Sequence, residues 1–196
     1  MVKYFHFKAN DHVFSKQLES VRCIGISKTG NQCGKRCLIG TSKCWIHLLS
    51  DHKLRIKPAT NPAMGLGLFA CNGTDDNAIV FRKDDLVIVY GGETITLATL
   101  HERYMRHTAP YGVEIRKDAL FKDCAVDRCI GGHINHGTNR VANCRFVPYR
   151  GEMKIRSVKN VRNNEELFVN YGRTYNQREQ NVISTTSSRK RPFAIR

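Results

Sequence analysis

The segment from Gly131 to Gly172 reads GGHINHGTNRVANCRFVPYRGEMKIRSVKNVRNNEELFVNYG, and it decides the fold. Residues 153–158 alternate apolar and basic side chains, which predicts a half-buried strand. A second strand is predicted at residues 168–169, just before Tyr171. Polar residues such as Asn135-His136 therefore gather at the ends of short strands, where rigid scaffolds commonly carry functional sites.

Four short motifs follow one another in a fixed order along the chain. They are Gly65-Leu66-Gly67-Leu68-Phe69-Ala70, Asn135-His136, Asn143-Cys144 and Glu165-Glu166-Leu167-Phe168-Val169-Asn170-Tyr171-Gly172. Together they resemble the ordered motifs of SET-domain protein lysine methyltransferases, over about residues 57–175. The resemblance implies a mostly β fold, namely the SET-domain fold of small β-sheets with short helices and a C-terminal pseudoknot near Asn135 and Tyr171.

The same resemblance implies an S-adenosylmethionine-dependent protein-lysine N-methyltransferase. Tyr171 would be the key catalytic residue, and Tyr90 and Phe146 would line the lysine channel. The implied cofactor-binding residues are Gly65, Leu66, Gly67, Leu68, Asn135, His136 and Tyr171. The two glycines would let the backbone approach the cofactor closely, because a Cβ would block that approach.

Methyl transfer to lysine needs a neutral amine held opposite the leaving sulfur, since an ammonium has no lone pair. An aromatic channel partly desolvates the amine, which lowers its pKa, and also fixes its direction. A phenol oxygen can accept weak C–H···O contacts from the activated methyl group. Phe146 stands where the family has Phe or Tyr, and Phe leaves room for further methylation. We therefore predict di- or trimethylation rather than monomethylation.

Simpler interpretations stay open for several of these residues. Asn135-His136 could be a loop pair that hydrogen-bonds its own backbone, and Tyr90 could be a core tyrosine with a satisfied hydroxyl. The segment 65–70 could be a plain turn between strands. It also has the spacing of a dinucleotide-binding loop, but prolines precede it and a polar loop follows, so this context excludes that fold.

Other elements are predicted between the motifs. Residues 86–90 are a continuous apolar run before Gly91-Gly92, which predicts a buried strand ending in a turn. Residues 97–107 are compatible with a helix and residues 111–115 with a strand. Three acidic residues lack a regular ligand spacing, and we interpret them as loop charges: Asp118, Asp123 and Asp127.

Residues 23–47 contain four cysteines and a histidine in the pattern Cys-x9-Cys-x3-Cys-x6-Cys-x2-His. Zinc prefers four soft or borderline ligands in a tetrahedron, and a Cys-x2-His turn supplies two of them. We predict that Cys23, Cys33, Cys44 and His47 bind Zn²⁺, with Cys37 competing for one position. The pattern is similar to small Cys-Cys-Cys-His modules, where the metal supplies stability that a short segment lacks. The alternative is four unconnected thiols in a flexible arm.

The length of 196 residues suits one domain of ordinary size and a small accessory unit. The predicted division is a basic N-terminal segment at 1–57 that holds the zinc module, a SET domain at 58–175, and a basic, flexible tail at 176–196. The net charge of +15 divides among them as +8, +3 and +4. Basic flanks favour a polyanionic partner, such as a nucleosome or a nucleic acid.

The sequence has no run of about eighteen apolar residues and no signal peptide at its start, so we expect no membrane partner. The expected location is the nucleus, or the host nucleus if the protein is viral. The expected substrate is a histone or another basic protein. Nothing in the sequence indicates the oligomeric state.

Some positions depart from the SET pattern. Gly137 replaces the usual Ser, Asn170 replaces a frequent Asp, and His133 stands where Arg is common. No cysteine follows Tyr171, although many SET enzymes close the lysine channel there with a zinc-bound cysteine cluster. The alternative function is a catalytically inactive SET-like module that binds chromatin or nucleic acid.

Overall fold

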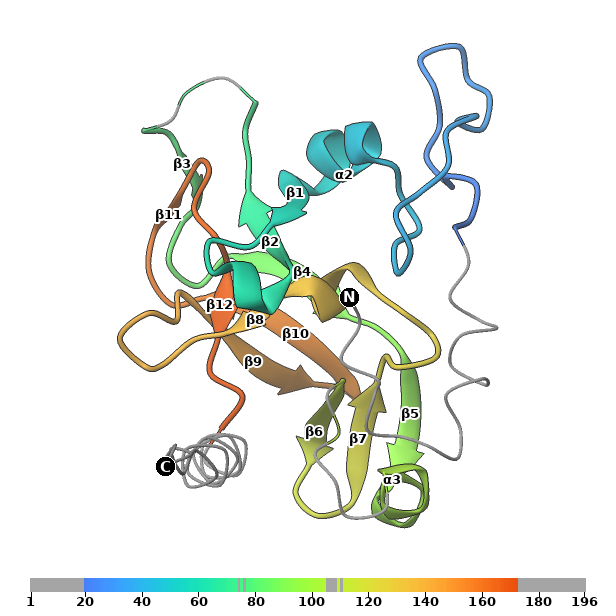
Figure 1. The fold of residues 1–196 in the computed structure, drawn as a ribbon, viewed down its shortest axis with the longest axis vertical. Helices are drawn as coiled ribbons and strands as arrows, with labels where there is room; N and C mark the ends of the chain where they lie inside the picture. The colour runs from blue at the N-terminus through green and yellow to red at the C-terminus, as the bar shows by residue number, and fades with distance from the viewer. Residues whose placement is uncertain (1–19, 74, 76, 105–108, 110, 173–196) are drawn as a thin grey trace, which may run out of the picture.

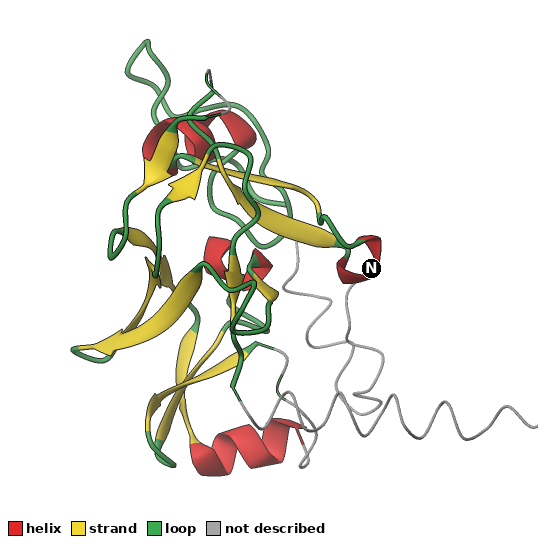
Figure 2. Ribbon diagram, turned by 90° about the vertical axis from the view of Figure 1, so that its left-hand side faces the viewer, coloured by secondary structure: helices red, strands yellow, loops and turns green. Residues whose placement is uncertain are grey.

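The computed structural model describes residues 20–73, 75, 77–104, 109 and 111–172. This part of the chain is mostly β-strand, in four small sheets with two α-helices and two 3-10 turns, as Figure 1 and Figure 2 show. The predicted fold class, small β-sheets with short helices, is therefore confirmed. The predicted tail at 176–196 lies outside the described residues.

Regular structure in the described residues begins with a helix and ends with a short strand. In chain order the elements are α2 (Trp45–His52), β1 (Leu54–Pro58), η1 (Pro62–Met64), β2 (Leu66–Ala70), β3 (Ile79–Phe81), β4 (Leu86–Tyr90), β5 (Glu93–Thr96), α3 (Leu97–Tyr104), β6 (Gly112–Arg116), β7 (Leu120–Asp123), η2 (Ile130–His133), β8 (Asn135–His136), β9 (Cys144–Tyr149), β10 (Glu152–Ser157), β11 (Val161–Arg162) and β12 (Phe168–Val169).

The largest sheet has the strand order β4-β10-β9-β12-β8. Its strand β10 alternates between buried and less buried positions, so the half-buried strand predicted at 153–158 is confirmed. The strand predicted at 86–90 is confirmed as β4, but only three of its five residues are buried. Leu86 and Val89 are exposed although they are three residues apart, because the pairing of β4 with β10 shifts register between Ile88 and Leu86 and interrupts the regular alternation of faces.

Strand β12 joins the segments that carry the predicted site residues. This strand lies between β8 and β9 and runs parallel to both. Asn143 holds it in place, since its side chain donates to the carbonyl oxygen of Glu166 (2.8 Å) and accepts from the N–H of Phe168 (2.9 Å). The strand predicted at 168–169 is thus confirmed, and it brings the Asn-His motif close to Tyr171.

β1 and β2 form a separate antiparallel pair that continues from helix α2. β1 spans residues 54–58 and so runs across the division predicted at residue 57. The motif at 65–70 is mostly strand β2 rather than a turn. No helix follows β2 among the residues described before β3, in keeping with the exclusion of a dinucleotide-binding fold.

The sheet β5-β7-β6 lies with α3 at the lower end of the molecule in Figure 1. The helix predicted at 97–107 is confirmed as far as Tyr104, and residues 105–107 lie outside the described part. The strand predicted at 111–115 is β6, displaced by one residue. Asp123 is fully buried and accepts hydrogen bonds from Arg103 (2.6 Å) and Tyr104 (2.7 Å). Its interpretation as a loop charge is therefore wrong, because α3 folds over the end of β7.

The N-terminal segment, blue at the upper right of Figure 1, has almost no regular structure before α2. Isolated bridges join Arg22 to Arg36 and Ile26 to Gln32. Residues 27–31 form a polar turn, with Gly30 at φ 82° and the N–H of Ser27 donating to the carbonyl of Asn31 (2.7 Å). No helix of the described residues is long and apolar enough to span a membrane.

Candidate active site and metal centre

Three of the predicted site residues, Asn135, His136 and Tyr171, come together where β8 and β12 run side by side, near the centre of Figure 1. His136 pairs with Val169 in this register, and Tyr171 follows two residues later. The backbone N–H of Tyr171 donates to Nδ1 of His136 at 3.1 Å. Nδ1 is therefore an acceptor, which places the ring proton of a neutral His136 on Nε2. The His136 side chain thus positions Tyr171.

The phenol of Tyr171 is also fixed from within the protein. Its hydroxyl donates to the carbonyl oxygen of Ile134 at 2.5 Å. A hydroxyl that donates its proton in this way can act toward a further group only as an acceptor. An acceptor oxygen at this position is what a C–H···O contact requires.

Three of the predicted residues form an aromatic row. The ring centroids of Tyr90 and Phe146 are 5.5 Å apart in an edge-to-face arrangement, and those of Phe146 and Tyr171 are 6.5 Å apart. His136 continues the row, with its centroid 5.3 Å from that of Tyr171. The structure therefore brings these side chains together around Phe146.

Tyr90 is the buried end of this row, with only 3% of its surface exposed. Its hydroxyl donates to the carbonyl of Tyr111 (2.9 Å), and the thiol of Cys124 lies 3.1 Å from its oxygen. Burial raises the pKa of Tyr90 well above its ordinary value, and burial likewise raises the pKa of the Cys124 thiol. These features match a core tyrosine with a satisfied hydroxyl, so its contact with a lysine substrate stays a prediction.

The glycine motif presents two different environments. Gly65 has a φ of 75°, and a Cβ built there would meet nothing within 4 Å, so this backbone faces open space. A Cβ on Gly67, in contrast, would lie 2.3 Å from Oε1 of Glu166. Leu66 is exposed, whereas the side chain of Leu68 is wholly buried in the core. Close approach of a cofactor therefore stays a prediction, and Gly65 is the glycine whose surroundings suit it.

Glu166 is a site residue that the sequence did not single out. It is 6% exposed. Its Oε2 accepts from the N–H of Thr60 at 2.7 Å, and its Oε1 accepts from the side-chain amide of Asn135 at 2.9 Å. The same amide donates to the carbonyl of Leu66 at 3.1 Å. Its place in the Glu165-Glu166 pair was the available signal, but spacing alone does not show which of the two carboxylates turns inward.

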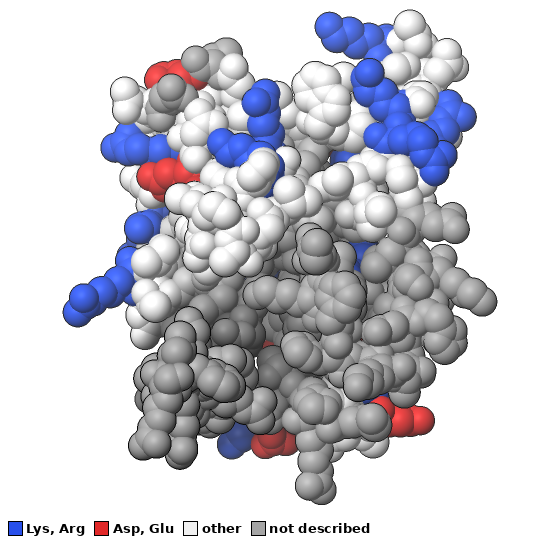
Figure 3. All heavy atoms as spheres, viewed as in Figure 1, with Lys and Arg blue, Asp and Glu red and all other residues white. Residues whose placement is uncertain are grey.

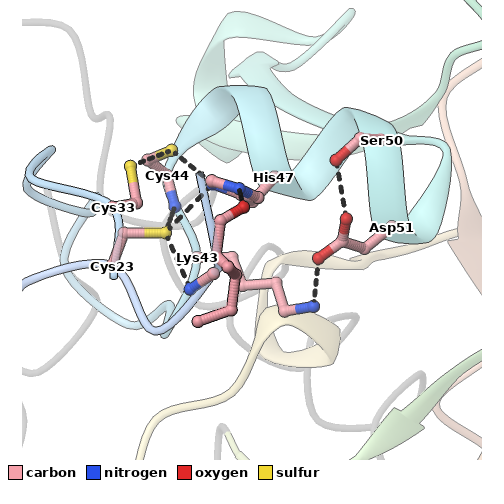
Figure 4. Close-up of polar contacts among 9 residues, drawn as sticks. Cys23, Cys33, Lys43, Cys44, His47, Ser50 and Asp51 are labelled. Atoms are coloured by element: carbon pink, nitrogen blue, oxygen red, sulfur yellow. Dashed lines mark hydrogen bonds and ion pairs between the residues drawn. The ribbon is translucent and has the colours of Figure 1, made fainter. Parts of the chain in front are cut away.

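The second site lies in the N-terminal segment. The ligand atoms of Cys23, Cys33, Cys44 and His47 all lie within 4.8 Å of one another, the set predicted from the sequence (Figure 4). The sulfurs of Cys33 and Cys44 are 3.9 Å apart, and Nδ1 of His47 is 3.4 Å from the sulfurs of both Cys23 and Cys44. Tetrahedral zinc would place sulfur pairs about 3.8 Å apart and sulfur–nitrogen pairs about 3.6 Å apart. The donor set fits the ion.

The surroundings of this cluster also suit a metal. Nε2 of His47 lies 2.8 Å from the carbonyl of Ile26, the kind of outer contact that orients a ligating imidazole. The backbone N–H groups of Gly25 and Cys44 point at the sulfur of Cys23, at 3.3 and 3.2 Å. A Cβ on Gly25 would lie 2.4 Å from the His47 ring, so only glycine lets the ring approach.

Cys37 is buried with the other three cysteines but stands outside the set of four. Burial and the nearby Cys23 raise the pKa of its thiol to about 11. Burial would also raise the pKa of Cys44, but hydrogen bonds from His47 outweigh that effect and lower it to about 6. Zinc binds the thiolate form, so the difference between these two pKa values agrees with Cys44 as a ligand and Cys37 as a cysteine that does not bind the metal.

Residues 23–47, called the cysteine segment below, also pack against the β-sheet core close to the predicted active site. A Cβ on Gly40 would lie 3.2 Å from Nε2 of His133 and 3.3 Å from the side chain of Arg128. Arg128 in turn stacks over the ring of Tyr111 at 3.9 Å. Burial lowers the pKa of His133 to about 4, so this imidazole is neutral at physiological pH. The loop around Gly40 thus contacts the core just before the Asn-His motif.

Comparison with known proteins finds a match to the family model for the SET domain over residues 65–172. No curated protein sequence matches the chain. Among solved structures, an autoinhibited ctPRC2 bound to S-adenosylmethionine is 22% identical, with a TM-score of 0.47 over 67% of this chain and 17% of that one. The crystal structure of Chaetomium thermophilum polycomb repressive complex 2 is 23% identical, with a TM-score of 0.47 over 61% of this chain and 15% of that one.

The chain thus spans only about a sixth of the length of those structural relatives. The family model is the stronger finding, because its match covers more than half of the 196 residues and includes all four motifs. This protein belongs to the SET domain family.

Proposed function

We propose that this chain is an S-adenosylmethionine-dependent protein-lysine N-methyltransferase. The observation that carries the proposal is the setting of Tyr171, whose phenol is tied to Ile134 and whose backbone is tied to His136 beside Phe146. A phenol held as an acceptor next to an aromatic side chain suits a channel that receives an amine and a methyl group. Tyr171 is the proposed catalytic residue.

The residues beside Tyr171 fit the implied cofactor. Gly65 offers backbone that faces open space, and Asn135 uses both amide protons inside the protein, so its carbonyl oxygen is the group left for a ligand. S-adenosylmethionine, when bound, supplies the activated methyl group. We assign its binding to the backbone of residues 65–68, to Asn135 and His136, and to Tyr171.

The chain's own residues supply orientation and desolvation. Phe146 and Tyr171 form apolar walls that favour a neutral amine over an ammonium, since burial disfavours the charged form. Holding the amine in line with its target supplies much of the rate in such a displacement. Phe146 carries no hydroxyl, so it adds no hydrogen bond to retain a partly methylated amine, and di- or trimethylation is the proposed outcome.

The proposed substrate is a histone within chromatin, in the nucleus. Residues 20–57 carry eight Lys or Arg against one acidic residue. Figure 3 shows a group of Lys and Arg side chains at the upper right, over the N-terminal segment. A basic surface repels an isolated basic peptide but is attracted to DNA phosphates, which favours a nucleosome over a free histone tail. The proposed organisation is a zinc-held basic module within residues 1–57, a SET domain at 58–175 and a basic tail at 176–196.

The test is transfer of labelled methyl groups from S-adenosylmethionine to free core histones and to nucleosomes by the full chain. Label on a histone lysine, with more transfer to nucleosomes than to free histones, is the expected result. Label on neither, by a protein that binds S-adenosylmethionine, would exclude the histone substrate. If the cofactor does not bind either, the chain is a SET-like binding module without turnover.

A further inference from the structure

Glu166 is a buried carboxylate whose two hydrogen-bond donors are neutral groups. It is 6% exposed, and its side-chain partners are the backbone N–H of Thr60 and the amide of Asn135. Among the described residues, no Lys, Arg or His forms an ion pair with it. Burying a carboxylate is costly unless its oxygens receive hydrogen bonds, so both hydrogen bonds are needed to offset the free-energy cost of burying Glu166.

The carboxylate and the carbonyl of Leu66 together decide which way the Asn135 amide points. An ionised carboxylate can only accept hydrogen bonds, and so can the carbonyl of Leu66, the second partner of the same NH₂ group. The opposite orientation would set the oxygen of Asn135 against two acceptors. The amide nitrogen therefore faces inward and the oxygen Oδ1 faces away from Glu166.

We infer that Glu166 is a positioning residue for cofactor binding, because it fixes Asn135 as an acceptor toward the ligand. The inference rests on the proposed function and deepens it. A carbonyl oxygen presented in this way favours a ligand group rich in N–H donors, and the α-ammonium of the cofactor's amino-acid portion is such a group. The reversed amide would present N–H donors and repel it.

Glu166 also links three segments that are distant in sequence. It reaches Thr60, 106 residues away, in the loop before Gly65, and Asn135, 31 residues away, on β8. It lies just before β12 and fills the space that a Cβ on Gly67 would need. One side chain thus holds the glycine motif, the Asn-His motif and the segment leading to Tyr171 in register.

The experiment measures calorimetric affinities of the zinc-loaded full chain for two probes. S-adenosylhomocysteine carries the amino-acid portion with its ammonium, and 5′-methylthioadenosine lacks it. Glu166→Gln is expected to weaken S-adenosylhomocysteine binding about tenfold and to change methylthioadenosine binding little, because a glutamine cannot accept from both Thr60 and Asn135. Glu165→Gln is the matched control, since it removes the same charge from the neighbouring position, and its affinity ratio should equal that of the wild type.

A double-mutant cycle separates positioning from a general structural effect. If Glu166 acts through Asn135, Glu166→Gln should not change the affinity ratio further in an Asn135→Ala background. An unchanged ratio in Glu166→Gln, or an equal loss in both backgrounds, would overturn the positioning role while leaving the proposed function intact. A wild-type chain that binds neither probe would overturn the proposed function itself.

An exchange variant covers the case in which Glu166→Gln does not fold. Asn135→Asp alone places two carboxylates together and should bind S-adenosylhomocysteine more weakly than the wild type. Asn135→Asp combined with Glu166→Gln restores a donor between the two positions and should recover part of that loss. An exchange variant that binds no better than Asn135→Asp alone would contradict the inference.

Discussion

The SET core and the cysteine segment achieve order in opposite ways. The core buries large apolar side chains from distant elements, among them Leu54, Leu68, Ile134, Met153 and Leu167. The cysteine segment buries only its four thiols as a cluster, while Ile24, Ile26 and Trp45 stay exposed, Trp45 at 64%. The core therefore depends on apolar packing, whereas the segment depends on what its thiols and His47 bind.

The largest expected effect follows from removing a metal ligand. Cys44→Ser should reduce bound zinc from about one equivalent to nearly none, because structural zinc sites contribute on the order of 10 kcal/mol to the fold that they hold. The measurement is metal content by mass spectrometry after dialysis. Cys37→Ser is the control in the same segment, since its thiol is buried but lies outside the set of four.

Zinc lost equally from Cys37→Ser and Cys44→Ser would show that the ligand set is wrong. Zinc retained by Cys44→Ser would show that Cys44 is not a required ligand. Either result would contradict the proposed set of four ligands.

The second effect tests the core through its buried ion pair. Asp123→Asn removes the charge that faces Arg103 and the hydroxyl of Tyr104. The free energy of unfolding should fall by about 3 kcal/mol, toward the lower end for a broken buried pair because Arg103 keeps Glu93 as a partner. Denaturant titration by circular dichroism measures this change.

Arg145→Gln is the matched control for that variant. Its ion pair with Asp84 is more than half exposed on both sides, so its loss should cost less than about 1 kcal/mol. Equal losses for the buried and the exposed pair would show that α3 does not close over β7 as described. Neither change should alter the zinc content.

The smallest expected effect concerns the aromatic row. Phe146→Tyr adds a hydroxyl beside Tyr171, which should retain partly methylated amines and shift the products toward monomethyl-lysine. A free-energy difference of about 1 kcal/mol suffices to change a product ratio severalfold. Mass spectrometry of the methylated substrate gives the distribution. A wild-type enzyme that already stops at monomethyl-lysine would contradict the proposed role of Phe146.

The contrast between the regions also explains what the sequence could predict. The predicted metal ligands of the cysteine segment lie within 25 positions of one another, so their spacing in the sequence was enough to predict that they cluster in space. The fold was predictable from the four ordered motifs, because each motif is a short run of neighbouring residues that can be recognised in the sequence itself. The role of Glu166 was not predictable, since its partner Thr60 is 106 residues away and nothing local distinguishes Glu166 from Glu165.

Burial was the second quantity that the pattern did not determine. The apolar run at 86–90 was predicted to be a buried strand, although Leu86 and Val89 are exposed. Asp123 was interpreted as a loop charge, although it is fully buried and accepts a hydrogen bond from Tyr104 of α3. Both depend on which elements pack above a strand, and neither strand carries that information in its own residues.

The most direct test of the account compares Tyr171→Phe with the wild type in the methyl-transfer assay on nucleosomes, with S-adenosylhomocysteine affinity measured in parallel. The substitution removes the one hydroxyl that we assign to the reacting methyl group and leaves the carbonyl of Ile134 without that donor. We predict a rate at least about 100-fold lower, as for other single groups that contact a transition state, with the affinity little changed. Transfer by Tyr171→Phe at the wild-type rate would contradict the assignment of this site.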